Sequence, residues 1–170
     1  GEADIKQNQE LQRKMFAIVR EEADSAKAMK RLLGVMQDAV AAEKDLDSAK
    51  RQMAEASMPG QAAQVNSPWF RFFLSYDPRT ILRKTVIPVL AVNGELDLQV
   101  SPSQNLPEIE RALKAAGNTQ FEAKVLPKLN HLFQTCKSGA LSEYGTIEET
   151  VSPIALQAMS DWMRRVTRTK

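Results

Sequence analysis

The stretch Val86-Ile-Pro-Val-Leu-Ala-Val92, which Asn93-Gly94 follows, decides the fold of this chain. It is a short, continuous apolar run that is rich in β-branched residues and is bounded by a turn signal. Such a run is typical of a strand that is buried on both faces, as the strands of a parallel sheet are. Pro88 fits near the start of this strand, because there a missing N–H is tolerated. We therefore expect an α/β fold built around a buried strand.

Helix and strand patterns alternate after this run. Apolar residues recur at helical spacing over Asn105–Ala116, and Gly117 follows as a signal for the end of a helix. Residues Phe121–Leu126 alternate as a second strand does, and Pro153 opens a last helix with an apolar stripe. This order implies a parallel sheet with right-handed crossovers. Two strands do not make a stable doubly wound sheet, so further strands are either missing or borrowed.

The part of the chain before the strands has a different character. Strong helix formers dominate it, and all eight prolines of the chain lie from Pro59 onward. Apolar residues recur every three to four positions, and residues suited to N-caps predict breaks near Asp24–Ser25 and Asp45–Ser48. The apolar positions follow a 3.6-residue period, which disfavours a coiled coil. We expect Pro59–Gly60 to end the helical segment.

Composition excludes several classes of function. The net charge of +2 comes from 23 basic and 21 acidic residues, so nothing favours a nucleic acid or a membrane surface as partner. A single cysteine, Cys136, excludes an internal disulfide and a cysteine-rich zinc site, and one histidine cannot build a multi-histidine metal site. No apolar run approaches the ~20 residues that span a bilayer. We expect no metal, no cofactor and no membrane span, whereas both a cytoplasmic and an exported location stay open.

Two titratable residues follow the two predicted strands. Asp97 lies in the turn after the first strand and His131 in the loop after the second, 34 positions later. Ligands bind beyond the carboxyl ends of parallel strands, and neighbouring strands would bring these two loops close together. A carboxylate beside an imidazole fixes its tautomer and stabilises its protonated form. The alternative for Asp97 is a structural role, in which its side chain caps the turn. The alternative for His131 is that it has a structural role or is merely exposed to solvent.

Three stretches resemble the α/β-hydrolases, in particular the bacterial esterase-like branch, which is also described as serine aminopeptidase-like or dienelactone hydrolase-like. Ile87-Pro-Val-Leu-Ala-Val-Asn-Gly-Glu-Leu-Asp97 resembles the strand and acid loop of that family. Leu126-Pro-Lys-Leu-Asn-His-Leu-Phe-Gln134 resembles its histidine loop. Ser67-Pro-Trp-Phe-Arg-Phe-Phe-Leu-Ser-Tyr-Asp-Pro78 resembles the segment between its cap and its core. The resemblance covers residues 67–166, and its acid and histidine come in the family's chain order.

The resemblance implies a serine hydrolase that cleaves small-molecule esters, with Asp97 as the triad acid and His131 as the general base. The family also needs a G-x-S-x-G turn before the acid, and this chain has none. The resemblance thus implies a helical cap segment over 1–66 and the last strands and helices of a hydrolase core over 67–170. The nucleophile and the N-terminal half of the fold would come from elsewhere. We expect such a chain to be inactive alone and to dimerise or swap segments.

Three further interpretations stay open at this stage. The aromatic residues Trp69, Phe70 and Phe73 could line a substrate pocket, although packing of the cap on the core explains them equally well. Cys136 lies five residues after His131 and could act as a nucleophile, although a free cysteine is more often a small buried apolar residue. The alternative function is a non-catalytic helical interaction module with a short α/β tail, which would rest on the amphipathic residues 1–57.

Overall fold

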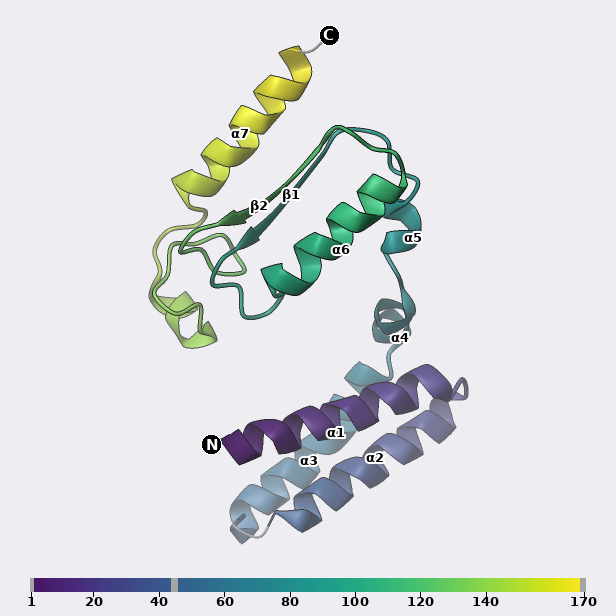
Figure 1. Ribbon diagram of the computed structural model, residues 1–170. Helices are drawn as coiled ribbons and strands as arrows, with labels where there is room; N and C mark the ends of the chain where they lie inside the picture. The colour runs from purple at the N-terminus through teal and green to yellow at the C-terminus, as the bar shows by residue number, and fades with distance from the viewer. Residues whose placement is uncertain (1, 44–45, 169–170) are drawn as a thin grey trace. The chain divides into compact units, whose positions relative to one another are not determined.

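A computed structural model describes residues 2–43 and 46–168 of the chain (Figure 1). The chain divides into two compact units between Tyr76 and Asp77. The described part of the first unit is helical, and the second unit combines helices with a two-stranded parallel sheet. The chain therefore has the mixed α/β character that its sequence predicts.

The described part of the first unit contains four helices, two of which begin at aspartate caps. In chain order these helices are α1 (Glu2–Glu21), α2 (Ser25–Ala42), α3 (Ser48–Val65) and α4 (Pro68–Ser75). The side chain of Asp24 accepts hydrogen bonds from the backbone N–H groups at the start of α2, and Asp47 caps α3 in the same way. The break predicted at Asp24–Ser25 is confirmed. The second break was predicted near Asp45–Ser48. Asp45 lies outside the described residues, and α3 begins at Ser48.

The core of the helical unit explains why α3 is longer than predicted. Its buried residues come from three helices: Ile18, Val19, Ala28, Leu32, Met36, Met58 and Ala62. The prediction that Pro59–Gly60 ends the helical segment is wrong, because α3 continues through both residues to Val65. Met58 and Ala62 flank this pair and are buried against α1 and α2. Their packing outweighs the helix-breaking tendency of proline and glycine.

Helix α4 belongs to the helical unit by its contacts. The ring centroids of Phe70 and Phe16 lie 5.6 Å apart. Arg71 donates hydrogen bonds to the backbone carbonyls of Val19 and Glu22, at 3.1 and 2.8 Å, and so satisfies the C-terminal end of α1. Helix α4 was predicted to lie with the α/β part, in residues 67–170, whereas in the structure the boundary between the units follows α4.

The second unit contains the sheet. In chain order its described elements are α5 (Arg79–Leu82), β1 (Val89–Gly94), α6 (Pro102–Ala115), β2 (Phe121–Leu126), a 3-10 helix (Leu141–Thr146) and α7 (Pro153–Arg168). Strands β1 and β2 pair in parallel, with Val89 opposite Phe121 and Gly94 opposite Leu126. The parallel pairing, the bounds of β2 and the start of α7 are as predicted. Strand β1 begins at Val89 rather than Val86, since Pro88 has no N–H to donate.

Helix α6 and a buried asparagine set the register of the two strands. Helix α6 contacts both strands and buries Leu106, Ala112 and Leu113. Gly117 follows α6 with a φ of +71°, as predicted for a residue that ends a helix. The side chain of Asn118 donates to the carbonyls of Thr85 and Ile87 and so ties the start of β2 to the start of β1. In consequence both strands end at the same edge of the sheet, and the loops that follow them are neighbours.

Candidate functional site

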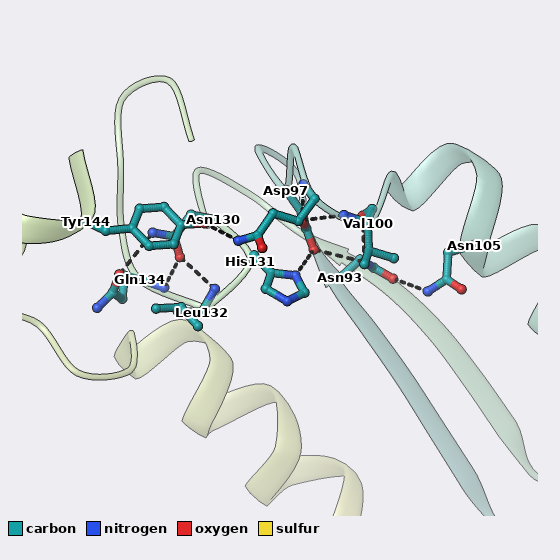
Figure 2. A network of polar contacts seen from close by, with 10 residues as sticks. Asn93, Asp97, Val100, Asn105, Asn130, His131, Leu132, Gln134 and Tyr144 are labelled. Atoms are coloured by element: carbon teal, nitrogen blue, oxygen red, sulfur yellow. Dashed lines mark hydrogen bonds and ion pairs between the residues drawn. The ribbon is translucent and has the colours of Figure 1, made fainter. Parts of the chain in front are cut away.

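The two predicted residues Asp97 and His131 meet at the carboxyl ends of the strands (Figure 2). Asp97 lies in the loop after β1, and His131 lies in the loop after β2. The Nδ1 atom of His131 is 3.0 Å from the Oδ2 atom of Asp97. The arrangement follows from the parallel pairing of β1 and β2, which brings together two loops that are distant in sequence.

The carboxylate of Asp97 is buried and fully engaged. Its side chain is 4% exposed. Its Oδ1 atom accepts hydrogen bonds from the backbone N–H groups of Gln99 and Val100, at 2.9 and 2.8 Å. Oδ1 therefore caps the turn, which is the structural role considered for this residue, whereas Oδ2 is directed to His131.

The surroundings of Asp97 keep it ionised. Burial raises the pKa of this carboxyl, but hydrogen bonds from the Val100 N–H, from His131 and from the Gln99 N–H together hold the pKa below its usual value. An ionised carboxylate can only accept hydrogen bonds, so Nδ1 of His131 is the donor in this pair. The neutral imidazole then carries its lone pair on Nε2.

The other side of the His131 ring is accessible. The side chain is 37% exposed, and within residues 2–43 and 46–168 its Nε2 atom has no hydrogen-bond partner. A ring whose Nδ1 is held by a buried carboxylate and whose Nε2 is open can accept a proton from an incoming group. The pair therefore has the geometry of an oriented general base.

Asn130 shapes the loop that carries His131. Its side chain is fully buried, and its Oδ1 atom accepts hydrogen bonds from the N–H groups of Leu132 and Gln134, at 3.0 and 2.9 Å (Figure 2). Its Nδ2 atom donates to Oε1 of Gln134 at 3.0 Å. Phe133 adopts a φ of +58° in this turn. This role of Asn130 was not predicted from the sequence, in which the signal is an asparagine, a turn-forming residue, directly before the histidine.

Gly94 allows the two loops to approach closely. A Cβ atom at this position would lie 2.3 Å from the Leu129 carbonyl oxygen and 2.5 Å from that of Asn130. Because Gly94 has no side chain, the N–H of Leu96 reaches the Leu129 oxygen at 2.9 Å and links the two loops. Glycine at the end of β1 is thus a requirement of the site as well as a turn signal.

Asn93 ties the acid loop to its surroundings. Its side chain is 5% exposed and donates to the carbonyl of Val100 at 3.1 Å, and its Nδ2 atom lies 3.4 Å from Oδ2 of Asp97. Its Oδ1 atom accepts a hydrogen bond from Asn105 of α6 at 2.9 Å. Asn93 therefore holds both ends of the loop around Asp97, a role that the sequence analysis did not assign to it.

The predicted substrate-binding aromatic residues lie on α4 of the helical unit. Trp69 and Phe73 are 69% and 59% exposed, and their rings stack with centroids 5.4 Å apart. Phe70 packs against Phe16 of α1, within the helical unit. A contact of these residues with a substrate stays a prediction.

Other candidates for chemistry are weaker. Burial raises the pKa of the Cys136 thiol, and this outweighs the hydrogen bond from the Gly139 N–H, so the reactive thiolate is disfavoured. In the described part of the chain, no serine, threonine or cysteine side chain is hydrogen-bonded to His131. Among the same residues, no group of three or more histidine, cysteine, aspartate or glutamate side chains could hold a metal ion.

Comparisons of the chain with protein-family models, with curated proteins and with solved structures give no significant match. Within residues 2–43 and 46–168, no helix combines the length and the apolar character that crossing a membrane requires.

Proposed function

We propose that Asp97 and His131 are the acid and the general base of a serine hydrolase that cleaves small-molecule esters without a cofactor. The observation that carries the proposal is the pair itself: a buried, ionised carboxylate at 3.0 Å from Nδ1 of an imidazole whose Nε2 is accessible. The resemblance of the two loops to those of the α/β-hydrolases supports the same role for each residue.

The reaction follows from this geometry. Nε2 of His131 accepts the hydroxyl proton of a serine while the serine oxygen attacks the ester carbonyl. The imidazolium that forms is stabilised by the charge of Asp97, which stays ionised throughout. The same proton then passes from Nε2 to the departing alcohol, and an acyl-serine remains. Water attacks this acyl group in the second half of the reaction, with His131 again as the base.

In this proposal the serine comes from residues outside this chain. The sequence contains no G-x-S-x-G turn, and within the described residues no hydroxyl group is bonded to His131. The two-stranded sheet supports the same interpretation, because parallel sheets are usually larger and covered on both faces. The chain alone would then have little esterase activity.

The test is an assay of the complete open reading frame that contains these residues. With p-nitrophenyl butyrate as substrate, we expect Asp97→Asn to lower kcat by about 10⁴-fold. Asp161→Asn on α7 is the matched control and should leave kcat unchanged, because this carboxylate is 47% exposed and, among the described residues, bonds only within its own helix. A fluorophosphonate probe should label a serine outside these 170 residues. Labelling of no serine, or full activity of Asp97→Asn, would refute the proposal.

The second candidate is a helical interaction module. The specific observation in its favour is that the helical unit has a core of its own, built from α1, α2 and α3. If this candidate is correct, Asp97 has only its structural role in the turn. Asp97→Asn would then weaken folding but leave every activity of the complete protein intact.

A further inference from the structure

An exposed row of aromatic side chains lies along α4. It consists of Trp69, Phe72, Phe73 and Tyr76, and we call it the aromatic stripe. The spacing i, i+3, i+4 and i+7 places the four rings on one face of the helix and its C-terminal cap. They are 69%, 62%, 59% and 49% exposed. Large aromatic residues that gather on an exposed surface usually mark a site of interaction.

The rings of the stripe contact one another. Trp69 stacks on Phe73 with an angle of 10° between the rings, and Phe72 lies 5.3 Å from Tyr76, centroid to centroid. Leu74, on another side of α4, packs against the core of the helical unit. The apolar stripe is therefore additional to the face that holds α4 in place.

Hydrogen bonds of Arg71 hold α4 on the helical unit, which favours a preorganised stripe. Arg71 donates to Oδ1 of Asn66 through both Nε and Nη2, at 2.9 and 2.6 Å. Its Nη1 atom donates to the carbonyls of Val19 and Glu22. A fixed helix loses little conformational freedom when it associates, which favours binding through this face.

The charges around the stripe disfavour a lipid surface. Helices that lie on membranes carry lysine and arginine on their polar face. Arg71 is the only basic residue between Ser67 and Tyr76, and its guanidinium is engaged by protein oxygens. The same range contains no acidic residue, so the stripe is an uncharged aromatic surface that suits another uncharged aromatic surface.

We infer that the aromatic stripe is the interface of a symmetric dimer of this chain. When two copies of α4 cross antiparallel about a two-fold axis near Phe72 and Phe73, Trp69 of each copy meets Tyr76 of the other. From the exposed fractions, the four rings offer about 500 Å² per chain, since each aromatic side chain has roughly 150–250 Å². Two stripes together bury up to about 1,000 Å², which is the size of a weak, reversible interface.

The experiment is sedimentation of the complete 170-residue chain from low to high micromolar concentration. We expect a reversible dimer whose dissociation constant rises by more than about 100-fold in the double variant Phe72→Ser/Phe73→Ser. The matched control is Leu156→Ser/Met163→Ser on α7, which removes two side chains that are 55% and 53% exposed, and it should leave the dimer unchanged. Circular dichroism checks that each variant keeps its helices.

A second measurement reports directly on the stripe. In a Trp162→Phe variant all tryptophan fluorescence comes from Trp69, and its emission should shift to the blue as the dimer forms. A chain that is monomeric at every concentration would overturn the inference, and so would a dimer that the stripe variant leaves intact. Binding of the monomer to phosphatidylcholine–phosphatidylglycerol vesicles through Trp69 would overturn it in favour of a lipid surface.

Discussion

Replacement of Gly94 by alanine should separate the two loops of the site. The new Cβ atom would lie 2.3 Å from the Leu129 carbonyl oxygen, and real Cβ atoms essentially never approach another atom within 3.0 Å. The obstacle is backbone, which cannot turn away as a flexible side chain does. The loop that carries His131 must therefore move outward by at least about 0.7 Å, the difference between these two distances.

The expected loss of stability follows from the contacts that this shift breaks. A shift of this size would lengthen the 3.0 Å contact between His131 and Asp97 beyond the range of a hydrogen bond. It would also lengthen the 2.9 Å bond from the Leu96 N–H to the Leu129 oxygen. At about 1 kcal/mol for each of the two hydrogen bonds and 1–3 kcal/mol for overpacking, we expect a loss of about 3–5 kcal/mol in the free energy of unfolding.

Urea denaturation measures this loss. In a Trp69→Phe background, the fluorescence of Trp162 reports on the α/β unit alone, which matters because two units can unfold separately. The control is Gly34→Ala in α2, where an added Cβ meets nothing within 4 Å. This control should stabilise the helical unit by up to about 1 kcal/mol, which circular dichroism during urea denaturation would measure. A Gly94→Ala variant with unchanged stability and unchanged His131 resonances would refute the close approach of the loops.

Three further predictions concern neighbouring groups. Asn130→Ala removes three hydrogen bonds of a fully buried side chain, so it should lower the free energy of unfolding by about 2–3 kcal/mol, as measured by urea denaturation. The control Asn8→Ala, on the exposed face of α1, should leave the free energy of unfolding unchanged. The pKa of Asp97 is depressed in the folded state, so the stabilisation it gives is complete above the unfolded value of about 3.9 and is lost as the pH falls through the folded pKa. Urea titrations between pH 7 and pH 2 should therefore show a larger loss of stability in the native chain than in Asp97→Asn. The raised pKa of the partly buried Cys136 thiol predicts slow modification by iodoacetamide at pH 7, and a thiol as reactive as a free cysteine peptide would contradict this prediction.

Local patterns in the sequence predicted much of the fold. Residues close by in the sequence determine the bounds of β2, the start of α7 and the cap at Asp24. Continuation of α3 through Pro59 could not be predicted in this way, because it depends on burial of Met58 and Ala62 against two other helices. Tertiary packing decides where local propensity is ambiguous.

Of the residues that form the site, only the two reactive ones could be predicted from the sequence. Asp97 and His131 could be placed because both follow strands, and parallel neighbours bring such loops together. Asn93, Gly94 and Asn130 were missed as site residues because their roles depend on distances between atoms of separate loops. The steric need for Gly94, for example, arises from a carbonyl oxygen 35 positions later in the chain, at Leu129.

The tautomer of His131 tests the central claim most directly. His131 is the only histidine, so its ring signals in a long-range ¹H–¹⁵N NMR spectrum need no assignment. At a pH where the ring is neutral, we expect the proton on Nδ1 and the lone pair on Nε2, because ionised Asp97 can only accept from Nδ1. Asp97→Asn should weaken this preference, and Asp161→Asn should preserve it. A neutral ring in the native chain that carries its proton on Nε2 would contradict the role of His131 as a general base oriented by Asp97.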